Sequence, residues 1–185
     1  MTDERDYEWA EAADERLAAL TITLVQPDDG RAIEVLSARS EYPRPMTFDE
    51  GLDAAFKLPD YGYGAVVVQT DAVDGWTALV EPGGWASSDP DRLSRLGANG
   101  VAVSVFWNVN ADMQFGFARS GSLVRFFDPL LYDNAADALP EESGLEWGAA
   151  HPRASALALL QRLTGARITR DWLLGRQRPT YVVPI

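Results

Sequence analysis

Two carboxylates have the residue type and the position needed for acid–base chemistry. Glu81 and Asp128 each stand at the end of an apolar run with strand character, and a proline follows each of them. If the two strand ends meet at one rim of a sheet, the pair has the composition of a glycosidase site, in which two carboxyl groups act as acid and base or nucleophile. The alternative is that both are solvated surface acids, because the chain holds 28 acidic residues.

The segment Gly83-Gly84-Trp85 follows directly after Glu81 and Pro82. Two glycines allow a backbone to approach another group closely, and the tryptophan beside them offers a broad apolar face and an N–H donor. The segment is either a platform for a sugar or another small ligand, or a lid that Trp85 folds over the end of the sheet. The candidate binding residues are Glu81, Gly83, Gly84, Trp85 and Asp128.

Composition excludes several other chemistries. The chain has no cysteine, so disulfides, thiolate catalysis and cysteine-based metal sites are impossible. The one histidine, His151, precedes a proline and is typical of a residue at the start of a helix. No G-x-S-x-G or G-x-x-x-x-G-K-[ST] motif occurs. We predict no cofactor and no metal.

Residues 108–112 place side-chain oxygens at alternate positions, as the first half of a calcium-binding loop does. Met113 stands where such a loop needs glycine, and Arg119 stands where it needs the bidentate glutamate. The segment is therefore predicted to be a polar hairpin turn.

An antiparallel sheet is expected to position the candidate residues. Val101 to Pro129 alternates apolar and polar residues in three runs separated by turn residues, which is typical of a β-meander. Residues 65–80 form a hairpin around Asp74-Gly75 and are expected beside the meander. We predict an α+β fold: a mainly antiparallel sheet of about five or six strands, with helices packed on one face and the far face partly covered by the C-terminal segment.

The remaining elements follow from shorter signals. Residues 21–25 and 181–183 are β-rich, the latter as an edge strand, and the proline-containing residues 40–46 are a loop. Thr47 and Glu50 form a capping box, and Asp89-Pro90 begins another helix.

The length of 185 residues predicts a single domain, 1–185. Its outer parts are an N-terminal helix over 1–20, an acidic loop over 130–152 and a basic C-terminal helical segment over 153–185.

The charge is unevenly spread along the chain. The net charge is −12, yet residues 151–185 contain six arginines and one aspartate, a net +5, which leaves −17 for residues 1–150. An acidic body disfavours nucleic acid and anionic membranes as partners. The basic segment either meets an acidic partner or packs on its own acidic domain. An acidic N-terminus without an apolar run predicts no signal peptide, no membrane span and a cytoplasmic location.

Four blocks together resemble a family of actinobacterial proteins that is known only as a domain of unknown function. They are Trp76-x4-Glu81-x2-Gly84-Trp85, Phe106-x-Asn108-Val109-Asn110, Phe127-Asp128-Pro129 and the run 163–169. The resemblance extends over residues 20–174 and implies no activity, cofactor or catalytic residue.

The acidic body and the absence of nucleophile motifs favour a non-enzymatic cytoplasmic protein-interaction module that binds a basic protein partner. An immunity-like protein that blocks a cationic toxin is one version of this hypothesis. The alternatives are a small-molecule-binding protein and a carboxylate-dependent enzyme that uses Glu81 and Asp128.

Overall fold

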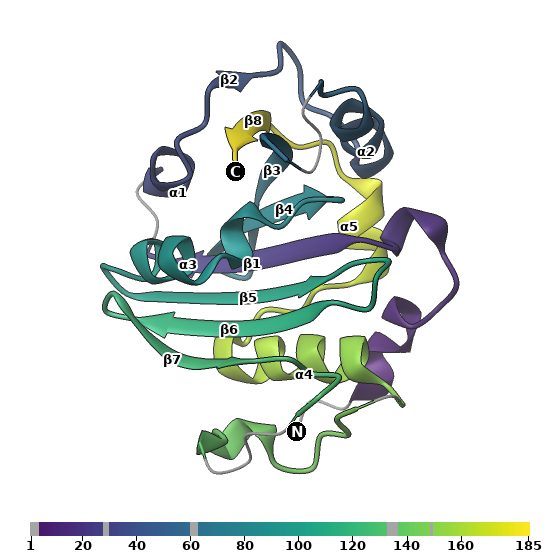
Figure 1. The fold of residues 1–185 in the computed structure, drawn as a ribbon, viewed down its shortest axis with the longest axis vertical. Coiled ribbons are helices and arrows are strands. Elements are labelled where there is room, and N and C mark those ends of the chain that lie inside the picture. Colours follow the sequence, from purple (N-terminus) through teal and green to yellow (C-terminus); the bar gives the residue numbers. More distant parts are fainter. Residues whose placement is uncertain (1–3, 28–29, 60–62, 133–136, 149) are drawn as a thin grey trace.

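The computed structural model describes residues 4–27, 30–59, 63–132, 137–148 and 150–185. Within these residues the fold is α+β, as predicted, with one antiparallel sheet in the order β2-β8-β3-β4-β1-β5-β6-β7 (Figure 1). The predicted count of five or six strands was too low, because the sheet has eight. The strands are β1 (Leu20–Gln26), β2 (Ser40–Glu41), β3 (Ala65–Val73), β4 (Trp76–Pro82), β5 (Val101–Trp107), β6 (Met113–Arg119), β7 (Ser122–Phe127) and β8 (Thr180–Pro184).

β1 accounts for part of the difference. It pairs with β4 on one side and β5 on the other, so it separates the hairpin from the meander, which were predicted to be neighbours. Six of its seven residues are buried, which suits a strand covered on both faces. At the far side, β8 lies inside the sheet and not at its edge, because the two-residue β2 pairs with it. Two residues are too few to give a periodic signal, and β2 falls in a predicted loop.

Helices cover both faces of the sheet, whereas the sequence predicted helices on one face and only partial cover of the other by the C-terminal segment. They are η1 (Glu4–Ala10), η2 (Glu15–Leu17), α1 (Arg31–Val35), α2 (Phe48–Phe56), η3 (Ala86–Ser88), α3 (Pro90–Leu96), η5 (Pro140–Glu142), α4 (Pro152–Thr164) and α5 (Arg170–Gly175). Figure 1 shows α3 in front of the sheet and α4 behind it. α4 and η1 pack with Leu20 and Ile22 of β1, whereas α1, α3 and η3 pack with Val25 and Ala102. Consecutive side chains of a strand point to opposite faces of the sheet, and β1 has apolar side chains on both faces. Each face therefore needs its own covering layer.

The N-terminal segment is two 3₁₀ helices and not the single helix expected over 1–20, of which residues 1–3 lie outside the described residues. Asp14 interrupts the helical run, because its side chain accepts a hydrogen bond from the Arg16 amide and caps η2. The side chains of Arg16 and Arg170 also donate to Asp14 and lower the pKa of its carboxyl. This carboxylate joins the two ends of the chain.

The arginines of the C-terminal segment pair mainly with the domain itself. Arg167 and Arg170 form ion pairs with Asp6 and Asp14 at 3.2 and 2.8 Å. Arg178 is fully buried, and its guanidinium bonds to Asp71 at 3.1 Å and to the Leu173 carbonyl oxygen at 2.8 Å. The basic segment 153–185 therefore packs on its own acidic domain, and several of its arginines form intramolecular ion pairs.

The acidic segment after Pro129 is anchored by a buried ion pair. Arg125 of β7 bonds to Glu142 of η5 through Nε and Oε1 at 2.8 Å, and both side chains are at most 3% exposed. Glu142 also accepts from the Tyr132 hydroxyl at 2.9 Å, and the Tyr132 ring stacks on Trp147 at 5.1 Å. Residues 133–136 and 149 of the predicted loop lie outside the described residues. In the rest, Glu142 and Leu145 are buried, whereas Asp137 and Glu146 are exposed.

The capping box at the start of α2 is confirmed. Hydrogen bonds from the Arg44 guanidinium and the Thr47 amide hold the pKa of Glu50 at about 2, against an ordinary value of 4.5. The ionised carboxylate thus stabilises the folded state above pH 4.5, and this contribution is lost as the pH falls toward 2.

We expect Arg44→Gln to raise the Glu50 pKa toward its ordinary value, because Arg44 supplies the largest interaction. The measurement is an NMR titration of the Glu50 side-chain carboxyl carbon. Lys57→Gln, which removes a charge at the other end of the same helix, should leave the titration unchanged. An unchanged Glu50 pKa in the Arg44 variant would contradict the assignment.

Candidate functional site

Glu81 lies near the end of β4 with its side chain fully buried. Its carboxylate accepts hydrogen bonds from the amides of Ala86 (2.6 Å) and Ser87 (2.8 Å) and from the Ser87 hydroxyl. Burial raises the pKa of this carboxyl, and the bonds from Ser87 and Ala86 act in the opposite direction. Glu81 is thus the buried hydrogen-bond acceptor of the η3 turn, and a ligand on the surface cannot reach it.

A chain of buried hydroxyls continues from this carboxylate into the sheet. The Thr23 hydroxyl lies 2.7 Å from that of Ser87 and donates to that of Ser104 at 2.8 Å. The Thr21 hydroxyl donates to the Gly84 carbonyl oxygen at 2.7 Å. These hydrogen bonds attach the segment 83–88, which carries Trp85, to β1 and through it to β5.

Gly83 and Gly84 allow the segment 83–88 to pack closely against the sheet. Gly83 has a φ of +71°, a conformation that favours glycine. A Cβ on Gly84 would stand 2.9 Å from Oε2 of Glu81 and 3.1 Å from Cβ of Val66. The close backbone approach that the sequence predicts is thus an approach to the protein's own sheet.

The structure does not bring Glu81 and Asp128 together. The register runs from Glu81 to Thr21, then to Phe106, then to Gln114. Asp128 follows Phe127, the partner of Phe115, and so continues this row one strand further. Four inter-strand steps of about 4.8 Å separate the two acids by roughly 19 Å. A glycosidase pair needs about 5–10 Å.

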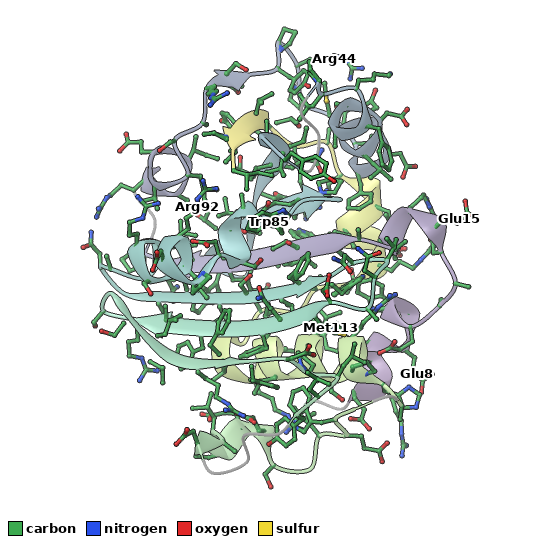
Figure 2. All side chains as sticks on the ribbon, viewed as in Figure 1. Glu8, Glu15, Arg44, Trp85, Arg92 and Met113 are labelled. Carbon is green, nitrogen blue, oxygen red and sulfur yellow. The ribbon has the colours of Figure 1, made fainter. Side chains whose placement is uncertain are left out.

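Trp85 and Asp128 do share a site, because both line an open groove of about 600 Å³. Trp85 is 37% exposed at one wall, and Asp128 is half-buried. The groove lies over the ends of β5 and β7 and the start of β6, the strand between them. Figure 2 shows Trp85 in front of the sheet and Met113 at the start of β6. Its other apolar lining residues are Pro90, Phe106, Phe126 and Phe127.

The polar lining of this groove is acidic. Asp89 accepts from the Arg92 amide at 3.0 Å, and Asp128 accepts from the Leu130 amide at 2.8 Å. Asp112 accepts from the Asn108 side-chain amide at 2.8 Å. None of the three carboxylates forms an ion pair with a residue that the structure describes. We call this site the acidic groove.

Sequence reasoning missed two of these acids as site residues. Asp89 was predicted only as a helix cap and Asp112 only as part of a turn, and both predictions are confirmed. A signal was nevertheless present, because Asp112 precedes β6 and Asp128 follows β7. In antiparallel neighbours, the start of one strand and the end of the next lie at the same edge.

A comparison with protein families matches the model described as a family of unknown function, DUF6461, to residues 1–184. The chain belongs to this family. The predicted resemblance to a domain of unknown function is thereby confirmed, and the match to DUF6461 extends beyond the residues 20–174 expected from the motifs. No curated protein and no solved structure matches the chain. Because the function of this family is unknown, the function of the chain has to be inferred from the geometry of the groove.

The described residues contain no group of three or more His, Cys, Asp or Glu side chains that could hold a metal ion. Residues 108–112 form the predicted polar turn, in which the Asn108 side-chain oxygen accepts from the amides of Asn110 and Asp112. His151 is exposed at the N-terminal cap position of α4. No described helix has the length and apolar composition needed to cross a bilayer.

Proposed function

We propose that this protein is a non-enzymatic protein-interaction module whose acidic groove binds a cationic side chain of a basic protein partner. The observation that carries the proposal is the set Asp89, Asp112 and Asp128, which surrounds an aromatic lining without an ion pair to any described residue. An arginine or a lysine combines an apolar stem with a charged head, and the groove combines the complementary surfaces.

Two physical effects support a cation as the occupant. A guanidinium stacks on the face of an exposed tryptophan, and Trp85 stands at the wall of the groove. The net charge of −12 attracts a basic protein from a distance and raises its rate of encounter at low salt. A partner of the cationic-toxin type would fit both effects, as in the immunity-like version of this proposal.

The geometry supports the alternatives less well. Catalysis by Glu81 and Asp128 as a pair loses its basis at a separation of roughly 19 Å, given the register of the sheet. A small cationic molecule would bind in the same groove, so only experiment can distinguish small-molecule binding from protein binding.

The test places a photo-reactive group in the groove. Trp85 is replaced by p-benzoylphenylalanine in the native host, and irradiated complexes are identified by mass spectrometry. We expect cross-links to a protein of basic isoelectric point, which weaken as salt is raised. Asp112→Asn with Asp128→Asn should reduce capture at least about tenfold, because both substitutions keep an oxygen acceptor and remove charge.

The matched control is Asp53→Asn with Glu34→Gln, which makes the same change in net charge at exposed sites outside the groove. Equal losses in the two double variants would indicate general electrostatics and would contradict a specific groove. Thermal-shift screening with cationic metabolites is the second arm. A stabilising metabolite together with no cross-linked protein would favour the small-molecule alternative.

A further inference from the structure

A second groove, of about 510 Å³, lies on the other side of Trp85 and has a different charge pattern. It shares Trp85 and Asp89 with the acidic groove, and its further lining includes Asp91, Arg92 and Arg95. The two arginines are three residues apart on α3, so they lie on one face of that helix. Figure 2 shows Trp85 and Arg92 in front of the sheet. We call this second site the arginine groove.

Arg92 is the distinctive side chain of the arginine groove. Its Nη1 is buried and has no hydrogen-bond partner among the described residues. Neither Arg92 nor Arg95 forms an ion pair with a residue that the structure describes. Inside the protein, the charge of Arg92 acts to lower the pKa of the buried Glu81 carboxyl without forming an ion pair with it. A guanidinium that has lost part of its water and forms no ion pair binds an anion more strongly than a fully solvated one does.

The charge balance of the arginine groove selects the kind of anion. Arg92 and Arg95 are opposed by Asp89 and Asp91, so the lining is neutral overall. Asp89 lines both grooves, and its carboxylate accepts a hydrogen bond from the Arg92 amide at 3.0 Å without losing its charge. A neutral lining with two guanidinium groups favours a singly charged carboxylate, which an arginine can bind through two parallel hydrogen bonds, over a dianionic phosphate.

We propose that the arginine groove binds the carboxylate of an aspartate or glutamate side chain on the same partner segment whose cationic residue occupies the acidic groove. This inference rests on the proposed function and deepens it. The recognised segment is bipolar: a basic and an acidic side chain straddle Trp85, whose exposed ring contacts the chain between them. Opposite charges in adjoining grooves fix the direction of the bound segment and reject purely basic sequences.

The first experiment probes each groove separately by NMR of the ¹⁵N-labelled full chain. N-acetylglutamate α-amide is the carboxylate probe, N-acetylarginine amide is the cation probe, and inorganic phosphate is the comparison anion. We expect the carboxylate probe to shift resonances of α3 and the Trp85 indole in a saturable way. Arg92→Gln should weaken this binding at least about fivefold without weakening the binding of the cation probe, because it removes a positive charge beside Asp89, which both grooves share.

Arg44→Gln is the matched control, because it removes an arginine outside both grooves. Equal weakening by the two arginine variants, or no response to the carboxylate probe, would overturn the inference. A stronger response to phosphate than to the carboxylate probe would also overturn it. If the cation probe still binds in those cases, the acidic groove and the proposed function stand. If only the cation probe fails, the proposed function fails and the arginine groove is a separate anion site.

The second experiment tests whether the two grooves act on one segment. A series of peptides carries one arginine and one glutamate at increasing separations, with either residue replaced by glutamine as controls. At the separation that spans Trp85, we expect binding at least about tenfold tighter than for either control peptide, because the second contact becomes intramolecular. Equal affinities across the whole series would show that the grooves are independent and would overturn the bipolar segment.

Discussion

Arg125→Met is expected to lower the free energy of unfolding by about 3–5 kcal/mol, because it leaves the carboxylate of Glu142 buried without its counter-ion. The remaining donors, the Tyr132 hydroxyl and the Leu139 amide, do not neutralise that charge. The arginine also lies 4.3 Å above the Phe127 ring, a contact that methionine replaces only in part. Urea unfolding followed by circular dichroism measures the change.

Arg119→Met on the neighbouring strand is the matched control. Arg119 also covers a phenylalanine, Phe117, at 5.1 Å, but it is exposed. Its loss should lower the free energy of unfolding by about 1 kcal/mol or less. The double variant Arg125→Met, Glu142→Leu should be more stable than Arg125→Met alone, since it removes the unpaired charge. A double variant that is no more stable would mean that the ion pair is not the source of the effect.

Glu81→Ala is expected to have the second large effect, on stability and on binding together. The substitution leaves the amides of Ala86 and Ser87 and the Ser87 hydroxyl without their buried acceptor. Each orphaned donor costs about 1–3 kcal/mol, so we expect a loss of roughly 3 kcal/mol or more in the free energy of unfolding. Because this carboxylate holds the segment that carries Trp85 in place, the affinity of the acidic groove for the cation probe, N-acetylarginine amide, should fall about tenfold or more.

Glu81→Gln separates the two effects, since the amide oxygen keeps part of the acceptor set while the NH₂ group faces a donor. We expect an intermediate loss of stability with the Trp85 segment retained, measured by urea unfolding and by the Trp85 indole resonance. Glu34→Ala removes an exposed acid and should leave both measurements unchanged. Full stability in Glu81→Ala would contradict the role assigned to this carboxylate.

The local elements of the fold could be predicted from the sequence because local signals determine them. The meander, the Asp74-Gly75 hairpin turn, the Thr47 capping box and the Asp89 cap depend on residues within a few positions of one another. The place of β1 between β4 and β5 depends on pairings between residues about 60 and 80 positions apart. No periodicity reports such pairings, so the strand order was missed, and the second helical layer was predicted only as partial cover by the C-terminal segment.

The candidate site was predictable in part for the same reason. Trp85 and Asp128 do line one groove, which supports a search at strand ends next to turns. The sequence could not show that Glu81 points into a buried network, because a carboxylate at a strand end has the same pattern whether water or Ser87 satisfies it. Nor could it show that Arg92 and Arg95 lie beside Trp85, since only the packing of α3 on the sheet brings them there.

The two borders of the sheet differ in form, but both are poorly suited to pairing with a strand of another molecule. On one side the sheet ends in β2, which has only two residues. On the other side it ends in β7, where the register shifts at Phe117 and Ala118 leave Val124 as a bulge, and where Arg125 points a charge inward. Short, bulged and inwardly charged border strands are poor templates for a further strand from another molecule. The arginine that anchors the segment after Pro129 is thus also the inward charge that disfavours edge-to-edge pairing at β7. Loss of Arg125 would release the anchored segment and remove this charge at the same time.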